Sequence, residues 1–199
     1  AMGRDMRAAV LEQDGKLEVG PVQIEDPRPG EVLVRVTDCG VCHSDLSAID
    51  GEHLGARPVD LGHEAGGIVE AVGPGVRHLH PGDHVVACMS GFCGHCANCL
   101  TGRPDKCVSR DEGARQPGSP SRLRCGDEDV HQYIELGGFA ERMLVGQHNV
   151  VKIDPALPLE RACLLGCGVL TGVGAVVNTA PPSIQRLSKK FAASAANCS

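Results

Sequence analysis

The chain has 199 residues, of which 42% are hydrophobic and 22% charged, and its formal net charge is −6 at pH 7. These values are typical of a globular domain with a sizeable core, and they exclude a disordered chain, a collagen and a coiled coil. Aromatic residues make up only 2% of the chain and no basic run is longer than the pair Lys189 and Lys190. Base stacking and phosphate binding are therefore disfavoured, and we expect no nucleic-acid partner.

Short apolar runs separated by glycine, proline and aspartate predict β structure along much of the chain. The expected strands are residues 6–11, 16–19, 32–36, 68–72, 85–87, 139–145 and 150–153. Asp14 and Gly15 predict a hairpin turn between the first two strands, and the third strand delivers residues 38–46 at its end. Residues 90–135 have no convincing hydrophobic period, so we expect a loop there that is held by something other than a core.

The C-terminal part changes character at Pro158, where the pattern becomes helical. Residues 162–177 are uncharged, but they contain four glycines and fall short of the ~20 apolar residues that a membrane span requires. We expect a buried, glycine-interrupted helix there and no membrane association. Residues 181–199 share neither pattern and are expected to form a poorly ordered tail.

Eleven cysteines are an unusually large number for a chain of this length. The N-terminus lacks the basic start, apolar stretch and cleavage site of a secretory signal, so a disulfide scaffold is disfavoured. We expect a reducing, cytoplasmic location in which the cysteines bind metal.

Four of these cysteines lie close together inside the expected loop. Cys93, Cys96, Cys99 and Cys107 are separated by two, two and seven residues. Thiolates three residues apart can wrap one ion, and a fourth thiolate completes the closed tetrahedron of structural zinc. Bound zinc would replace the missing core of this lobe, residues 90–110. Unliganded thiols are one alternative; an iron–sulfur cluster is another, although the fourth cysteine does not follow the ferredoxin spacing.

Three separated segments offer a second set of metal ligands. They contain Cys42, then His63 followed by Glu64, and finally Cys167. Each residue alone is more often a structural side chain, but two thiolates and an imidazole together make a site with an open position for water or an alcohol oxygen. The spacing does not single out this set, because Cys39 and Cys163 could join Cys42 and Cys167 in a closed all-thiolate site.

Five stretches occur in the order CGVCHSDL, GHEAGGIVEAVGPGV, GDHVV, CGHCANC with Cys107, and ACLLGCGVLTGVGAVVNTA. Through them the chain resembles the zinc-dependent alcohol dehydrogenases of the medium-chain dehydrogenase/reductase superfamily, and residues 108–138 look most like the longer animal-type and formaldehyde dehydrogenase branches. The resemblance implies a mainly β domain with a few helices (α+β) over residues 6–180. Its expected form is a GroES-like, partly open β-barrel with a zinc-binding loop lobe.

The resemblance also implies two zinc ions per chain, one structural in the four-cysteine lobe and one catalytic. The implied ligands of the catalytic ion are Cys42, His63 and Cys167, with Glu64 as a transient ligand. Asp45 would orient His63, and Ser44 would take the alcohol proton while a hydride leaves for a nicotinamide. Ser47 departs from the family at a position where many members carry a histidine that extends the proton relay.

His43 and Thr171 fall where the family touches the nicotinamide cofactor, although ordinary surface and helix positions are the alternative for both residues. The glycines between Gly166 and Gly174 do not match the dinucleotide-binding fingerprint, because they are one residue too long and no strand precedes them. We therefore expect that the family's Rossmann domain is absent and that NAD(P) binds only together with that missing part.

The expected function is that of a catalytic domain which oxidises a small primary alcohol, or a hydroxymethyl adduct, to an aldehyde, and which is inactive alone. The alternative is a stand-alone, non-catalytic zinc-binding module or truncated remnant that acts by interaction. Without the nucleotide domain, the face around the catalytic ligands and residues 162–177 would be partly exposed, so we expect self-association through this cleft.

Overall fold

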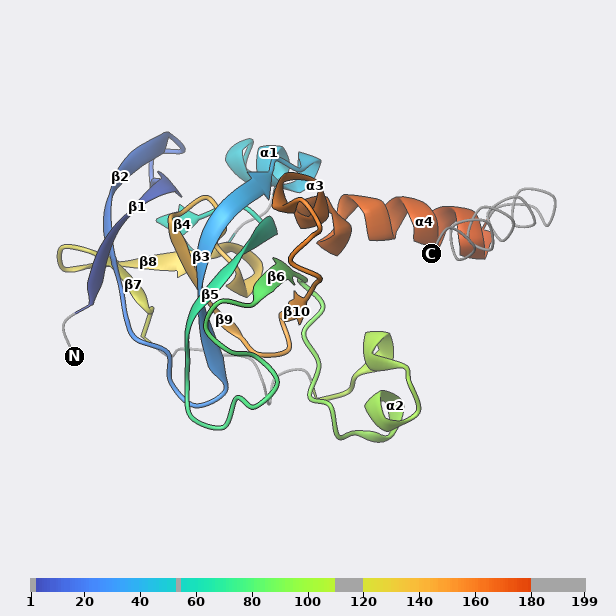
Figure 1. Ribbon diagram of the computed structural model, residues 1–199. Coiled ribbons are helices and arrows are strands. Elements are labelled where there is room, and N and C mark those ends of the chain that lie inside the picture. The colour runs from blue at the N-terminus through green and yellow to red at the C-terminus, as the bar shows by residue number, and fades with distance from the viewer. Residues whose placement is uncertain (1–2, 53–54, 110–119, 180–199) are drawn as a thin grey trace.

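The computed structural model describes residues 3–52, 55–109 and 120–179, and the structural statements below concern these residues. Two β layers form the body of the molecule, a closed barrel and a five-stranded sheet (Figure 1). The four-cysteine lobe and a C-terminal helix extend from this body (Figure 1). The predicted mainly β fold is confirmed.

The closed barrel has the strand order β1-β2-β7-β8-β4. Its strands are β1 (Arg4–Leu11), β2 (Leu17–Ile24), β7 (Leu123–Cys125), β8 (Glu128–Gln132) and β4 (Val59–Asp60). The predicted hairpin joins β1 to β2, and Gly15 adopts a φ of 84° in its turn, a value that favours glycine. β4 runs parallel to β8, whereas the other pairs are antiparallel.

The second layer has the strand order β10-β6-β5-β3-β9. Its strands are β10 (Val150–Lys152), β6 (His84–Ala87), β5 (Glu64–Val72), β3 (Glu31–Gly40) and β9 (Arg142–Gly146). β3 alternates between two cores: Val32 and Val34 pack in one aliphatic cluster and Leu33 in the other. β9 alternates in the same way, with Leu144 in the second cluster, so both strands fix the sheet against the barrel. The two clusters are aliphatic and contain no aromatic residue among their buried members.

The helical segments are short except for the last one. They are α1 (His43–Ile49), α2 (Ala97–Leu100), η1 (Pro104–Lys106), η3 (Tyr133–Glu135), α3 (Leu159–Ala162), η4 (Cys163–Gly166) and α4 (Gly168–Thr179). Among the described residues no single helix is long and apolar enough to cross a membrane, although Leu159–Gly166 and Gly168–Thr179, bent by 53°, reach that length and composition together.

The expectation of a buried helix at residues 162–177 is wrong for most of its length. The chain leaves helical geometry at Cys167, where φ is −136° and ψ −81°, and α4 then points away from the barrel (Figure 1). No residue of α4 is buried, and Leu170 and Val173 are 59% and 54% exposed. The apolar composition was correctly read as helix, but no described layer covers the helix. The sequence also predicted that residues 162–177 would be partly exposed beside the expected catalytic ligands, and this exposure is observed.

The expectation of loop across residues 90–135 is also wrong in its second half, because β7 and β8 lie there and complete the barrel. Arg122, only 2% exposed, anchors this hairpin with guanidinium contacts of 2.7 Å to Glu25 and 2.6 Å to Glu31. Each strand contributes one buried residue, Leu123 or Val130, which is too few to give a visible period. The expected tail at 181–199 lies outside the described residues.

Candidate metal centres

The four-cysteine lobe brings its Sγ atoms together. All four lie within 4.8 Å of one another, with 3.9 Å between Cys93 and Cys99 and 3.4 Å between Cys96 and Cys99. Tetrahedral zinc–thiolate bonds place two sulfurs about 3.8 Å apart, whereas a disulfide needs about 2.05 Å. The separations therefore fit one small ion, while several irons would hold the thiolates farther apart.

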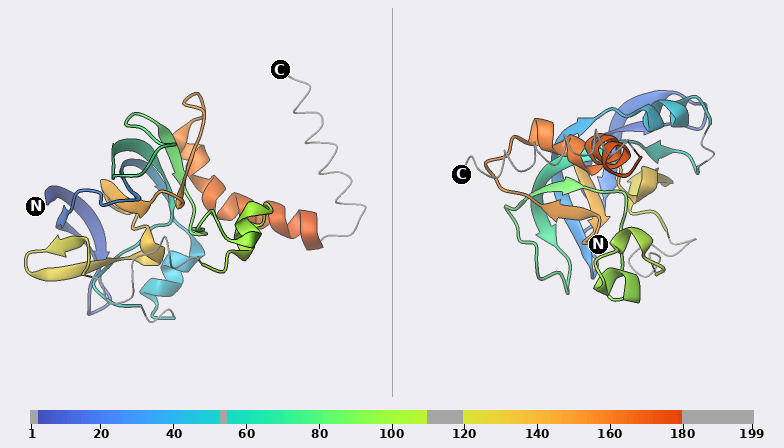
Figure 2. Two further views of the ribbon diagram at one scale, coloured as in Figure 1. Left: turned by 90° about the horizontal axis from the view of Figure 1, so that it is seen from below. Right: turned by 90° about the vertical axis from the view of Figure 1, so that its right-hand side faces the viewer.

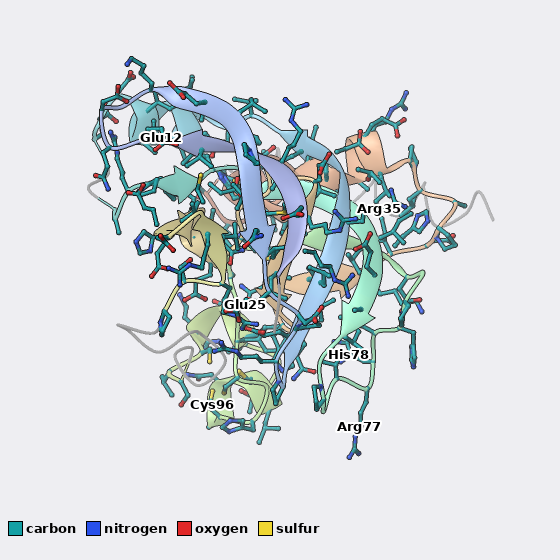
Figure 3. All side chains as sticks on the ribbon, turned by 90° about the vertical axis from the view of Figure 1, so that its left-hand side faces the viewer. Glu12, Glu25, Arg35, Arg77, His78 and Cys96 are labelled. Atoms are coloured by element: carbon teal, nitrogen blue, oxygen red, sulfur yellow. The ribbon has the colours of Figure 1, made fainter. Side chains whose placement is uncertain are left out.

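Backbone N–H groups around the lobe lower the pKa of the Cys96 and Cys107 thiols, whereas burial and the neighbouring cysteines raise the pKa of Cys99 to about 12. The backbone N–H of Cys96 donates to Cys93 Sγ at 3.3 Å, and that of Cys93 donates to Cys107 Sγ at 3.4 Å. Donors of this kind, from Cys99 and Val108, lower the pKa of the Cys96 thiol to about 6. No residue of α2 or η1 is buried, and the lobe lies beside the strands rather than among them (Figures 2 and 3). Because its helices contain no buried residue, we expect the order of the lobe to depend on a metal ion held by its sulfur atoms.

The second ligand group begins at α1. Cys42 is the N-cap residue of this helix, and Ser44 and Asp45 lie in its first turn. The fully buried Asp45 carboxylate accepts hydrogen bonds from the backbone N–H of Cys42 at 2.9 Å and from that of Gly62 at 3.2 Å. Asp45 therefore joins the helix to the segment that carries His63.

His63 lies between β4 and β5 and is 1% exposed. Its Nδ1 lies 3.3 Å from Asp45 Oδ1, and this hydrogen bond raises the pKa of the imidazole. Burial favours the neutral form of Asp45, yet the hydrogen bonds from His63 and Cys42 hold the pKa of this carboxyl below its ordinary value. His63 Nε2 is buried and has no hydrogen-bond partner among the described residues. A buried polar atom left in this way fits a metal ligand, since such atoms are almost always satisfied.

The remaining donors of this group converge on His63. One ligand atom from each of Cys42, His63, Glu64 and Cys167 lies within 4.8 Å of the others, and the two Sγ atoms are 4.0 Å apart. Glu64 Oε1 accepts the backbone N–H of Gly168 at 3.2 Å, which ties the start of α4 to β5. The donor set of two sulfurs and one imidazole nitrogen, with a carboxylate beside them, fits zinc.

The thiols of this group differ in their ease of ionisation. Burial opposes the thiolate of Cys42, but hydrogen bonding with Ser44 and the neighbouring imidazole of His63 hold the pKa of this thiol below its ordinary value. Burial and the neighbouring charge of Cys42 raise the pKa of Cys167 to about 12. Ser44 Oγ lies 3.7 Å from Cys42 Sγ, at the edge of the ligand group.

The all-thiolate alternative does not form among the described residues. Burial raises the pKa of Cys39 to about 12, and its Sγ lies 3.6 Å from the carbonyl oxygen of Gly40 rather than in the ligand group. The Cys163 thiol donates to the carbonyl of Glu160 at 3.6 Å. Both side chains are part of the packing behind the site.

The two residues expected to contact a cofactor are exposed. His43 is the first residue of α1, and Thr171 lies in α4, one turn after Cys167. Their roles stay predictions. Tyr133, which sequence reasoning had not placed at the site, has its ring 5.9 Å from that of His63. Its only signal was its rarity, because it is the single tyrosine of a chain that contains no tryptophan.

Comparisons with known proteins find relatives over most of the chain. Residues 28–155 match the family described as "Alcohol dehydrogenase GroES-like domain". The chain is 45% identical over 172 residues to an NDMA-dependent alcohol dehydrogenase from Amycolatopsis methanolica, covering 83% of this chain and 46% of the relative. It is 40% identical over 179 residues to an S-(hydroxymethyl)glutathione dehydrogenase from Escherichia coli, covering 87% and 48%.

A solved structure supports the same relationship. A crystal structure of an "Alcohol dehydrogenase zinc-binding domain protein" from Burkholderia ambifaria is similar with a TM-score of 0.79 and 40% identity, covering 88% of this chain and 49% of the other. The chain spans about half the length of the curated relatives it matches. The GroES-like fold is therefore common to this chain and to these relatives.

Proposed function

The chain belongs to the family of alcohol dehydrogenase GroES-like domains, and from that premise we propose that it is the catalytic domain of a zinc-dependent alcohol dehydrogenase. The proposed reaction oxidises a primary alcohol, or a hydroxymethyl adduct, to an aldehyde with transfer of a hydride to NAD(P). The observation that carries the proposal is the buried Nε2 of His63, which has no hydrogen-bond partner in the part of the chain that the structure describes and lies among two thiols and a carboxylate.

Each residue of the ligand group has a proposed part in the reaction. Cys42, His63 and Cys167 would hold zinc, whose positive charge stabilises an alkoxide when it is bound. Asp45 keeps the Nδ1 side of His63 occupied, so Nε2 stays free to face the ligand position. Glu64 stands ready as a transient ligand beside the two thiols.

Ser44 has a proposed role in moving the alcohol proton. Its hydroxyl lies on the first turn of α1, beside the thiol of Cys42 and in a partly exposed position. An alcohol oxygen bound in the ligand group would be within reach of this hydroxyl, which accepts the proton and passes it outward. Ser47 lies one turn further along α1, where a relay would end at a hydroxyl rather than at an imidazole.

NAD(P) is proposed as the hydride acceptor, with His43 and Thr171 as residues that contact it. Because the chain spans about half of its relatives' length, hydride transfer is proposed for the protein that also contains a nucleotide-binding part. The four-cysteine lobe would hold a second, structural zinc, so that each chain binds two ions.

Elemental analysis of the purified chain, together with a visible spectrum, tests this proposal. We expect two zinc ions and no colour in the wild type, and one zinc ion in either His63→Ala or Cys96→Ser. The same single zinc in the wild type and in His63→Ala would contradict the proposed catalytic site. Iron with visible absorption would contradict the assignment of the lobe.

A second candidate function is a stand-alone zinc-binding module that acts by interaction. The exposed apolar residues of α4 favour it, because such a face is typical of protein–protein contacts. Alcohol-dependent reduction of NAD⁺ or NADP⁺ separates the two candidates when it is assayed in the protein that includes the nucleotide-binding part. Activity lost in Cys42→Ala supports the dehydrogenase, whereas two bound zinc ions without activity favour the module.

A further inference from the structure

A strained turn lies directly after Tyr133. Ile134 has φ 52° and ψ 34°, and Glu135 has φ 60°, so two successive residues with side chains adopt the left-handed conformation. This conformation is unfavourable for residues other than glycine, and most of all for a β-branched one such as isoleucine. It persists only where the surrounding structure determines it, which happens mostly at functional sites.

The surroundings that hold this turn are the residues leading to His63. Leu136 is fully buried and donates its backbone N–H to the Tyr133 carbonyl at 3.0 Å. The backbone N–H of Gly138 donates to the carbonyl of Gly62 at 2.8 Å, and that of Phe139 to the carbonyl of Leu61 at 2.9 Å. The turn is therefore fixed to the two residues that precede His63.

The turn places Tyr133 between the start of α1, which follows Cys42, and the segment that carries His63. Its ring meets the His63 ring edge to face, with 5.9 Å between centroids and 63° between planes. Its hydroxyl donates to the backbone carbonyl of Ser44 at 3.3 Å. Ser44 belongs to the first turn of α1, which also carries Asp45 and follows the N-cap residue Cys42.

We propose that Tyr133 is a positioning residue, whose phenol locks the first turn of α1 against the His63 segment and so sets the position of the Cys42 thiolate relative to His63 Nε2. This inference rests on the proposed zinc site. Asp45 also links α1 to this segment, through Gly62 and His63, and Ala48 in the last turn of the helix packs with Leu61. The Ala48 contact fixes the end of α1, whereas the phenol acts on its first turn, next to Cys42.

Zinc affinity tests the proposal, with the lobe as an internal reference. Tyr133→Phe removes the hydroxyl and keeps the ring, so we expect about a tenfold loss of affinity at the His63 group, as is typical when a residue that supports metal ligands is changed. The affinity of the lobe stays unchanged. Titration of the zinc-free wild type and variant against a chromophoric chelator measures both affinities.

Thr37→Val is the matched control, because it removes another hydroxyl that donates to a backbone carbonyl, that of Gly66, at 3.2 Å. Cobalt supplies the readout that a purely structural role would not move. In Tyr133→Phe the visible bands of cobalt in the His63 group shift, while Thr37→Val has the wild-type spectrum. Thermal unfolding of the zinc-free proteins should show similar, small losses for both variants.

Three results would overturn the proposal. Tyr133→Phe could retain the wild-type affinity and cobalt spectrum, which would show that the hydroxyl positions nothing. Equal losses at both zinc sites would show a general loss of stability. A wild type that binds zinc only in the lobe would refute the proposed function and this proposal with it, and that failure is visible before any variant is made.

Discussion

The two ligand groups of this molecule are built in opposite ways. The lobe takes all of its donors from one short stretch, residues 93–107, whose helices α2 and η1 contain no buried residue. The His63 group takes its donors from segments up to 125 positions apart and supports them with the fully buried Asp45. We expect a site of the first kind to form only when its ion is bound, whereas the fold holds the donors of the second kind in place before any ion arrives.

Metal removal should therefore affect the two regions very differently, and this is the largest effect that we predict. Chelation of zinc should unfold the lobe, because structural zinc supplies on the order of 10 kcal/mol to a small domain that has no other core. The barrel should remain folded on its aliphatic clusters. Hydrogen exchange measured by mass spectrometry would show loss of protection across residues 93–107 and retention in β3 and β5.

Cys99→Ser provides the matched genetic experiment, since it removes one lobe ligand without a chelator. It should reproduce the exchange pattern of the chelated protein in the lobe and leave His63 and its neighbours protected. Equal loss of protection in the lobe and in β3 would refute the contrast, because the barrel would then also depend on metal.

The contrast also explains which parts of the structure could be predicted from the sequence. The spacing of Cys93, Cys96, Cys99 and Cys107 predicts the geometry of their site, because all four lie within one short stretch of chain. The same reasoning could not separate Cys39 and Cys163 from Cys42 and Cys167, because tertiary structure alone decides which thiols face His63. The resemblance to a known family selected the ligand set that the structure brings together.

Two features escaped prediction for physical reasons. The β7–β8 hairpin has one buried residue in each strand and is anchored by the buried guanidinium of Arg122, a residue type expected at the surface. The helix α4 is apolar enough to read as a core element, but the chain turns at Cys167 and carries it away from the body. Local pattern identifies a helix, whereas its burial depends on what packs against it.

A smaller effect concerns the pH dependence of the barrel, measured on zinc-free protein so that the lobe makes no contribution. Asp60 on β4 is fully buried, and its carboxylate has no hydrogen-bond partner among the described residues. This burial raises the pKa of the Asp60 carboxyl well above the usual range. Below about pH 4 the Asp60 carboxyl is protonated in both the folded and the unfolded state. As pH rises, only the unfolded state gains the charged form, so the free energy of unfolding falls. Asp60→Asn should remove this fall and stabilise the protein by roughly 2 kcal/mol at pH 8.

Asp83→Asn is the control, because its effect on the free energy of unfolding at high pH should be opposite in sign to that of Asp60→Asn. Lys152, whose Nζ lies 2.6 Å from the Asp83 carboxylate, lowers the pKa of this group with help from the backbone N–H of His80. The stabilisation is present above the unfolded pKa of about 3.9 and is lost as pH falls through the folded pKa. Asp83→Asn should therefore cost ~0.5–1 kcal/mol at pH 8 and progressively less as the pH falls below about 3.9. Urea unfolding from pH 2 to pH 8 measures both variants, and parallel slopes in the two would contradict the assignment of Asp60.

The smallest effect on stability is expected in α4, which shares with α2 and η1 the absence of buried residues. Leu170→Glu and Val173→Glu should change the free energy of unfolding by less than about 0.5 kcal/mol, because neither side chain is packed. Both should nevertheless reduce self-association of the chain at high concentration, since these side chains are 59% and 54% exposed within a run of apolar residues.

Val151→Glu, at a position that is 53% exposed on the edge strand β10, is the matched control and should leave association unchanged. Sedimentation velocity over a concentration series distinguishes these outcomes. A wild type that stays monomeric throughout would show that an exposed apolar helix does not suffice for association, whereas equal reductions in all three variants would attribute the effect to added negative charge rather than to α4.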